Sequence, residues 1–188
     1  LTYFRLYMQS DAVMMEDVGE IGETTFQTLR KFLLYGTKAK MENCAESWGL
    51  LLVSGPKAAH TIQSAFGVDV VDLQPVDFVT AQIGGSHALV LRTEETGEVD
   101  IEILLHSTSL LVAWNRLLEA GAKFGITPIG THAREALRME AGIPMAGPDL
   151  NEEIVPPEAN LEGKAFSLSK GCYPGQEVVA RMDTYGNV

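Results

Sequence analysis

The chain has 188 residues, of which 46% are hydrophobic and 21% charged, so it can bury a core of ordinary globular composition. Its 14 lysines and arginines against 25 aspartates and glutamates give a net charge of -11, which argues against direct binding to nucleic acid or to an anionic membrane. No run approaches the about 18 apolar residues of a membrane span, and Cys44 and Cys172 are expected to be free thiols in a reducing compartment.

A strand and then a helix are the first expected elements. Residues 1–8 are aromatic-rich and partly alternating, which is typical of a half-buried strand. Thr24 or Thr25 is a suitable helix N-cap, and Gly36 a suitable end. The apolar stripe of this helix would be Phe26, Leu29, Phe32 and Leu33. Because the sequence opens within a strand and stops without a tail, we expect it to be a segment of a longer protein.

Two further strands and a second helix are expected next. Residues 38–43 alternate in polarity, and residues 48–53 form a compact apolar run, so both are predicted to be strands. Ser54-Gly55-Pro56 is predicted to begin a helix. The buried side of that helix would be Ala58, Ala59, Ile62, Ala65 and Phe66.

The middle of the chain is predicted to form a run of strands. Residues 76–83, 87–92 and 100–105 each have strand character, and the pair Gly84-Gly85 suits a tight turn between the first two. Antiparallel hairpins, rather than steady alternation of strand and helix, are the arrangement that such short connections favour.

Two more helices follow these strands. One is expected over residues 110–120, capped by Ser107, Thr108 or Ser109 and ended by Gly121, and another over residues 132–141, stopped by Gly142. The order strand, helix, strand, strand, helix, strand predicts an α+β fold of the split-βαβ kind. Residues 142–163 are rich in proline and polar residues, and long irregular loops in compact domains are often functional.

The octapeptide Lys170-Gly171-Cys172-Tyr173-Pro174-Gly175-Gln176-Glu177 carries the strongest chemical signal. Pro174 suits the first position of a helix, and the glycines allow close approach of the backbone to a ligand. A helix N-terminus and the nearby ammonium of Lys170 both favour thiolate over thiol. Cys172 is therefore a candidate reactive cysteine, although a small buried apolar side chain is the ordinary alternative.

Three blocks of the C-terminal third together resemble one family. They are Ala133-Arg134-Glu135-Ala136-Leu137-Arg138-Met139-Glu140-Ala141-Gly142-Ile143-Pro144, then Pro157-Glu158-Ala159-Asn160-Leu161, then the octapeptide with Val178-Val179-Ala180-Arg181. Their order and spacing resemble the folate-binding part of the aminomethyltransferase (glycine cleavage T-protein) superfamily. The octapeptide resembles the hallmark of the YgfZ-type branch, which assists assembly or repair of iron–sulfur clusters.

This resemblance implies an α+β fold of two ferredoxin-like units around a central cavity. Residues 1–188 would form one folate-binding domain, truncated at both ends and without the small C-terminal barrel of the family. Tetrahydrofolate is the implied ligand, and iron–sulfur proteins or cluster-assembly factors are the implied partners. A cytoplasmic location, or the mitochondrial matrix in a eukaryote, would follow.

Glu140 is the first-choice residue for holding the pterin ring. A carboxylate accepts the adjacent N–H donors of such a ring with charge assistance, and the resemblance assigns this role to the glutamate of the first block. The ordinary alternative is a solvated acid paired with Arg134 or Arg138. Arg138 and Glu158 are expected to support the proline-rich loop by bonding its backbone carbonyl and N–H groups.

The remaining candidates lie in and after the octapeptide. Cys172 is expected to act in redox or cluster chemistry, and Lys170 to promote its thiolate or to receive a carboxylate of folate. Tyr173 is expected to stack on a flat ligand or to fill the core. Arg181 is a candidate folate contact, with an exposed i, i+4 ion pair to Glu177 as its alternative. No second Cys or His lies at metal-ligand spacing from Cys172, so no protein-held metal is predicted.

The sequence leaves enzyme and accessory factor both open. In the resembled enzymes an early strand carries an acidic pair, and aligning the first strand here places Tyr3 and Phe4 at that position. Neither side chain supplies an anionic base. The leading hypothesis is therefore a tetrahydrofolate-binding accessory protein for iron–sulfur clusters. The alternative is an aminomethyltransferase that transfers a one-carbon unit to tetrahydrofolate, and a binding module without chemistry is the third.

Overall fold

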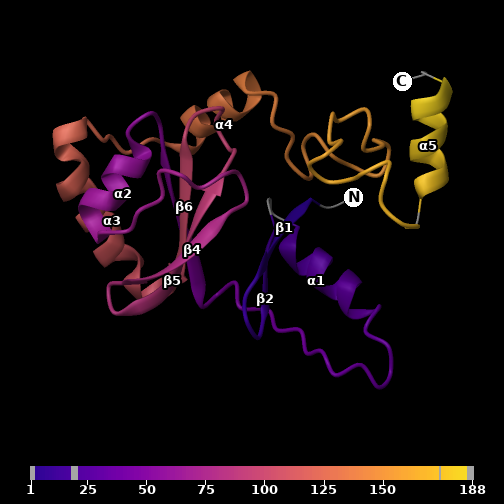
Figure 1. Cartoon of the computed structure of the whole chain (residues 1–188), viewed down its shortest axis with the longest axis horizontal. Helices are drawn as coiled ribbons and strands as arrows, with labels where there is room; N and C mark the ends of the chain where they lie inside the picture. Colours follow the sequence, from indigo (N-terminus) through magenta and orange to yellow (C-terminus); the bar gives the residue numbers. More distant parts are fainter. Residues whose placement is uncertain (1–2, 18–20, 174, 186–188) are drawn as a thin grey trace. The chain divides into compact units, whose positions relative to one another are not determined.

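A computed structural model describes the chain except for residues 1–2, 18–20, 174 and 186–188 (Figure 1). The described residues form two open sheets and a set of helices, and neither sheet closes into a barrel, which confirms the predicted α+β class. The chain divides into two compact units. Unit 1 comprises Leu1–Tyr35 and Pro144–Val188, and unit 2 comprises Gly36–Ile143.

The sheet of unit 2 contains four antiparallel strands in the order β3-β6-β5-β4. Their bounds are Trp48–Ser54 for β3, Phe78–Ile83 for β4, Ser86–Thr93 for β5 and Asp100–His106 for β6. All four were predicted. Gly84 and Gly85 have φ angles of 59° and 82°, a left-handed conformation that favours glycine, and they form the predicted turn between β4 and β5.

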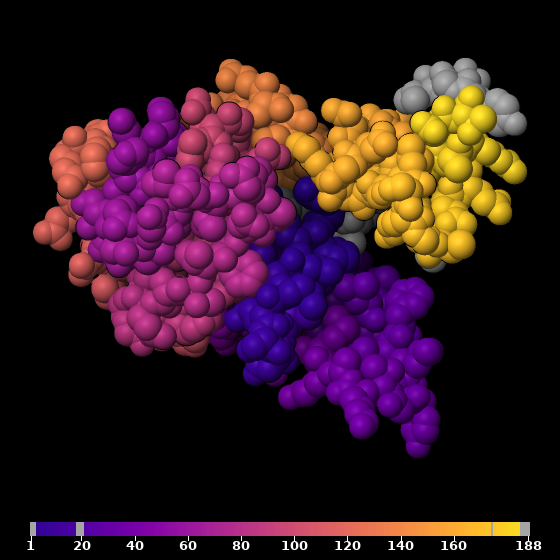
Figure 2. Space-filling model, viewed as in Figure 1, coloured from indigo at the N-terminus to yellow at the C-terminus, as the bar shows by residue number. Residues whose placement is uncertain are grey.

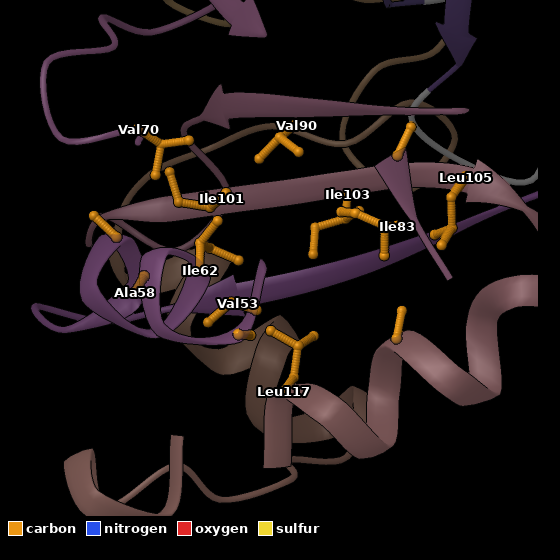
Figure 3. Close-up of a cluster of buried hydrophobic side chains, with 14 residues drawn as sticks. Val53, Ala58, Ile62, Val70, Ile83, Val90, Ile101, Ile103, Leu105 and Leu117 are labelled. Atoms are coloured by element: carbon orange, nitrogen blue, oxygen red, sulfur yellow. The ribbon is translucent and has the colours of Figure 1, made fainter. Parts of the chain in front are cut away.

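Helices α2 (Ala58–Phe66) and α3 (Leu110–Gly121) cover one face of this sheet, and both confirm their predictions. Figure 3 shows Ile62 of α2 and Leu117 of α3 directed toward Val53 and the isoleucines of β6. Alternation along β6 places Ile101, Ile103 and Leu105 in this core, so Asp100, Glu102 and Leu104 point to the opposite face.

The last helix of unit 2 is α4 (Thr131–Glu140), within one residue of its predicted bounds. Gly142 follows it with a φ of 65°, which ends the helix as expected. Among the helices that the structure describes, none combines the length and apolar character needed to cross a bilayer.

Unit 1 contains the antiparallel hairpin of β1 (Phe4–Met8) and β2 (Val13–Asp17). Glu16 of β2 accepts a hydrogen bond of 2.8 Å from the hydroxyl of Tyr7 and pairs with Arg5 at 3.5 Å. The helices of this unit are α1 (Gly22–Arg30) and α5 (Gln176–Tyr185). Strand β2 was missed because Val13-Met14-Met15-Glu16-Asp17 lacks the alternation of apolar and polar residues that marks a strand.

Several predictions in the first 45 residues were wrong. Helix α1 begins at Gly22 with Ile21 as its N-cap, so Thr24 and Thr25, the predicted caps, lie inside the helix. Helix α1 ends at Arg30 rather than near Gly36, because the next N–H groups bond three residues back and tighten the chain into a turn. Phe32, expected on the buried stripe, is 75% exposed. Residues 38–43 form no strand, since their alternation carries almost no large apolar side chains to bury.

The proline-rich segment beyond α4 is held by local hydrogen bonds. Glu158 accepts a bond of 3.0 Å from the N–H of Val155, as predicted. Two isolated bridges, Ala146↔Leu150 and Glu162↔Phe166, close short loops in this segment. The prediction that Pro174 starts a helix concerns a residue outside the described part of the chain, and α5 itself begins two residues later.

Candidate functional site

The predicted site residues are divided between the two units. Glu140 belongs to unit 2, whereas Lys170, Cys172, Tyr173 and Arg181 belong to unit 1. Each group is therefore built separately from the contacts of its own unit.

Helix α4, which carries Glu140, is fixed to the loop between β5 and β6. Arg134 in its first turn donates a hydrogen bond of 3.0 Å to Glu95 of that loop. The Glu95 side chain is only 2% exposed, whereas Arg134 is 36% exposed. A buried carboxylate is costly without a charged or hydrogen-bonding partner, so this pair is a strong constraint on the helix.

The same loop, residues 94–99, is shaped by Asp100 at the start of β6. One carboxylate oxygen of Asp100 accepts hydrogen bonds from the N–H groups of Glu95 and Thr96, at 2.7 and 2.8 Å. The other oxygen accepts a bond of 2.7 Å from the Thr96 hydroxyl. Asp100 is fully buried, so these bonds replace the water that its carboxylate loses. The loop is thus a preformed support for Arg134.

The far end of α4 also meets this loop. A Cβ added to Gly97 would lie 3.0 Å from Cβ of Ala141, so loop and helix are in close contact there. Arg138, which is 5% exposed, donates hydrogen bonds to the carbonyl of Ile143 and to the Glu135 side chain. The bond to Ile143 is the support of the proline-rich loop that was predicted for Arg138. Contacts at both ends therefore set the position of α4.

Glu140 is the last residue of α4 and is exposed. The ordinary alternative paired it with Arg134 or Arg138, but these arginines pair with Glu95 and Glu135 instead. The Glu140 carboxylate makes no ion pair among the described residues. Its assignment as the pterin ligand stays a prediction.

A second carboxylate, Glu102, was missed in the sequence. It lies in the middle of β6, is 2% exposed, and is engaged with other groups of the protein. Its register partners are Leu52 on β3 and Leu91 on β5, so it is flanked by leucines. We call this surface of the sheet, which points away from α2 and α3, the leucine face; its residues are Leu50, Leu52, Leu89, Leu91, Glu102 and Leu104.

The sequence did contain a signal for Glu102. Residues 101–105 are otherwise apolar, and a single acid inside such a run is unusual because burial of its charge must be compensated. A buried carboxylate among leucines is an environment suited to the N–H donors of a flat heterocycle. Glu102 is therefore a second candidate for holding such a ring.

The octapeptide group lies before and in α5, coloured yellow at the visible surface of Figure 2. Cys172 is an exposed free thiol, and Cys44 is a free, half-buried one, so both predicted free thiols are confirmed. The ammonium of Lys170 lies 5.0 Å from the ring centre of Tyr173, a cation–π contact. The N–H of Tyr173 donates to the Gln176 side chain at 3.1 Å, which links the motif to the first turn of α5.

Arg181 is exposed on α5. It makes no ion pair with Glu177 among the described side chains, so the expected i, i+4 pair is not formed. Tyr173 is half-buried, which leaves part of its ring accessible. Lys170, Cys172, Tyr173 and Arg181 thus offer a thiol, two cations and an aromatic ring within one short segment. Their roles stay predictions.

Comparison with known proteins agrees with the predicted superfamily. Residues 6–168 match the family described as the GCVT N-terminal domain. The chain is 34% identical over 150 residues to an aminomethyltransferase of Caldanaerobacter subterraneus, covering 79% of the chain and 40% of that relative. It is 37% identical over 148 residues to an aminomethyltransferase of Bacillus subtilis, covering 78% of the chain and 41% of the relative. The chain thus spans about two fifths of the length of these curated relatives, and it belongs to the aminomethyltransferase (GCVT) family.

Proposed function

We propose that the protein binds tetrahydrofolate and serves in the transfer of a one-carbon unit to it, as an aminomethyltransferase of the glycine cleavage type. The observation that carries this proposal is the similarity over more than three quarters of the chain to relatives named aminomethyltransferase. This reverses the order of the two hypotheses drawn from the sequence, in which the accessory role came first.

Tyr3 and Phe4 are weak evidence against transfer. Their assignment to the position of the acidic pair depends on an alignment of the first strand, and both residues precede the part of the chain, residues 6–168, that matches the family. The matched part includes both candidate carboxylates, Glu102 and Glu140, and the loop that supports α4.

The proposed role of these two carboxylates is to bind and orient the tetrahydrofolate ring. A tetrahydrofolate ring carries adjacent N–H donors in one plane, and a carboxylate accepts two of them at once. Glu140 offers such a group at an accessible helix end, and Glu102 offers one in a leucine-lined setting that excludes water. Exclusion of water strengthens a charge-assisted hydrogen bond, so the setting of Glu102 favours the tighter contact.

Titration of the protein with tetrahydrofolate in a calorimeter tests the proposal, followed by an assay for folate-dependent release of amine from an aminomethyl donor. We expect saturable binding and measurable turnover. Absence of binding would overturn the proposal, and binding without turnover would leave only its folate-binding part. Glu102→Gln and Glu140→Gln, measured in the same titration, identify which carboxylate meets the ring.

A second candidate function rests on the octapeptide. Its resemblance to the YgfZ-type branch and the exposure of the Cys172 thiol favour a folate-binding accessory role toward iron–sulfur proteins. Cys172→Ser separates the two functions. Under the accessory role this variant impairs iron–sulfur enzymes in cells and leaves folate binding intact, whereas under aminomethyl transfer it leaves both the cluster enzymes and turnover unaffected.

A further inference from the structure

One end of the sheet of unit 2 carries a row of three polar side chains on the side that points away from α2 and α3. The register places Ser54 of β3 and Thr93 of β5 on either side of Asp100 of β6. We call these three residues the polar row. The next row along the same strands is Leu52, Glu102 and Leu91, which belongs to the leucine face.

Two members of the polar row have their hydrogen bonds supplied by the loop of residues 94–99. Asp100 accepts from both backbone N–H groups and from the hydroxyl of Thr96. Ser54 and Thr96 share a hydrogen bond between their hydroxyl groups. The local network is therefore well satisfied, and the loop is not loosely packed at this point.

Thr93 differs from its two neighbours. It is 1% exposed, and its hydroxyl oxygen has no hydrogen-bond partner among the described residues. Leaving a buried hydroxyl unpaired lowers stability, so valine, which has the same shape, would be the more stable residue here. A costly polar group retained beside a satisfied network is a feature that protein stability alone does not explain.

The position of Thr93 relative to Glu102 indicates what its hydroxyl can meet. The two residues are diagonal neighbours on adjacent strands and on the same side of the sheet. Diagonal side chains are about 7 Å apart, within reach of one edge of a fused two-ring heterocycle. Beside its N–H donors a pterin carries a carbonyl oxygen, to which a carboxylate cannot donate a hydrogen bond but a hydroxyl can.

We propose that the Thr93 hydroxyl donates a hydrogen bond to the ring carbonyl of bound folate, next to the N–H donors that face Glu102. Thr93 is then a specificity-determining residue, since it recognises the oxo group. This inference rests on the proposed function, because it takes folate as the ligand.

The test compares two buried threonines. Thr93→Val removes an unpaired hydroxyl, whereas Thr61→Val on α2 removes one that donates to the carbonyl of Lys57 at 3.0 Å. We expect Thr93→Val to be at least as stable to urea as the parent and to bind tetrahydrofolate about five- to tenfold more weakly, the scale of one lost hydrogen bond. Thr61→Val should be less stable and should bind with unchanged affinity. Thr93→Ser, which keeps the hydroxyl, should bind within about twofold of the parent.

A folate analogue supplies the last arm of the experiment. When the ring carbonyl is replaced by a hydrogen atom, which neither accepts nor donates a hydrogen bond, Thr93→Val should no longer weaken binding relative to the parent. Unchanged affinity of Thr93→Val for tetrahydrofolate, an equal loss with Thr93→Ser, or a lowered stability of Thr93→Val would each overturn the inference while the proposed function stands. Failure of the parent protein to bind tetrahydrofolate would overturn both.

Discussion

Arg134 of α4 donates a hydrogen bond of 3.0 Å to Glu95, a nearly fully buried acid in the loop between β5 and β6. The two residues are 39 positions apart in the sequence. Their contact makes the helix that ends in Glu140 part of the same structure as the sheet that carries Glu102. Both candidate carboxylates of unit 2 therefore depend on one loop for their relative positions.

Arg134→Leu is expected to lower the free energy of unfolding by about 1–3 kcal/mol, because Glu95 loses a charged partner and stays buried. Urea denaturation measures this change. The matched control is Lys40→Leu, which removes one partner of the exposed Lys40–Glu42 pair, whose side chains are 86% and 75% exposed. That control should stay within about 0.5 kcal/mol of the parent. Equal changes in the free energy of unfolding for the two substitutions would show that the Glu95–Arg134 contact does not contribute to stability.

Gly97→Ala tests the second contact between this loop and α4. The left-handed φ of Gly97, 77°, already disfavours alanine by about 1–2 kcal/mol, and the new Cβ would press on Ala141. Gly125→Ala has nearly the same φ, 79°, with no atom within 4 Å of the added Cβ. We expect the melting temperature to fall more for Gly97→Ala than for Gly125→Ala. The difference between the two falls in melting temperature measures the contact between this loop and α4. Equal falls would show that the contact does not contribute to stability.

Glu140→Gln should separate binding from stability. An acid at the C-terminal end of a helix opposes the helix dipole, so its neutralisation should raise the free energy of unfolding by about 0.3–1 kcal/mol. If Glu140 holds the ring, the same change should weaken tetrahydrofolate binding by about 2–3 kcal/mol in a calorimetric titration. Glu119→Gln in the last turn of α3 is the control, with the same gain in stability and no change in affinity. If Glu140→Gln leaves the affinity unchanged, Glu140 does not hold the ring, and Glu102 is the remaining candidate carboxylate.

Cys172 should be the first thiol modified in the folded protein. Its side chain is exposed, whereas that of Cys44 is half-buried. Brief treatment with iodoacetamide under native conditions, read by peptide mass spectrometry, should label Cys172 several-fold faster than Cys44. Both thiols should react at similar rates in urea, which provides the control. Faster native labelling of Cys44 would contradict the exposure seen at the octapeptide.

Periodicity was sufficient to predict the sheet of unit 2 and the helices that cover it. Strands β3 to β6 and helices α2 and α3 carry apolar patterns that match the buried core, so local pattern and tertiary burial agree there, whereas α4 was predicted with Gly142 as its end. Predictions from periodicity were wrong in the first 45 residues, where few side chains are buried. Residues 38–43 alternate without apolar bulk, and α1 stops at Arg30 although apolar residues continue to Tyr35.

The candidate site was only partly predictable for a different reason. Short motifs identified Glu140 and the octapeptide, because their residues are adjacent in the sequence. Glu102 left a local signal, a single acid inside an apolar run, whereas Glu95 and Thr93 acquire their meaning from strand register and burial, which bring separate parts of the chain together. No local window contains that information, so these residues required the structure.

Unit 2 is one continuous stretch of chain inserted between the two parts of unit 1. During translation, at about 5–20 residues per second, the whole of Gly36–Ile143 is synthesised, and begins to emerge, before the second part of unit 1 is made. The sheet of the inserted unit can therefore form on the nascent chain while the β1–β2 hairpin still awaits residues 144–188. Chaperone contact during synthesis is consequently expected to concentrate on the β1–β2 hairpin until residues 144–188 have emerged.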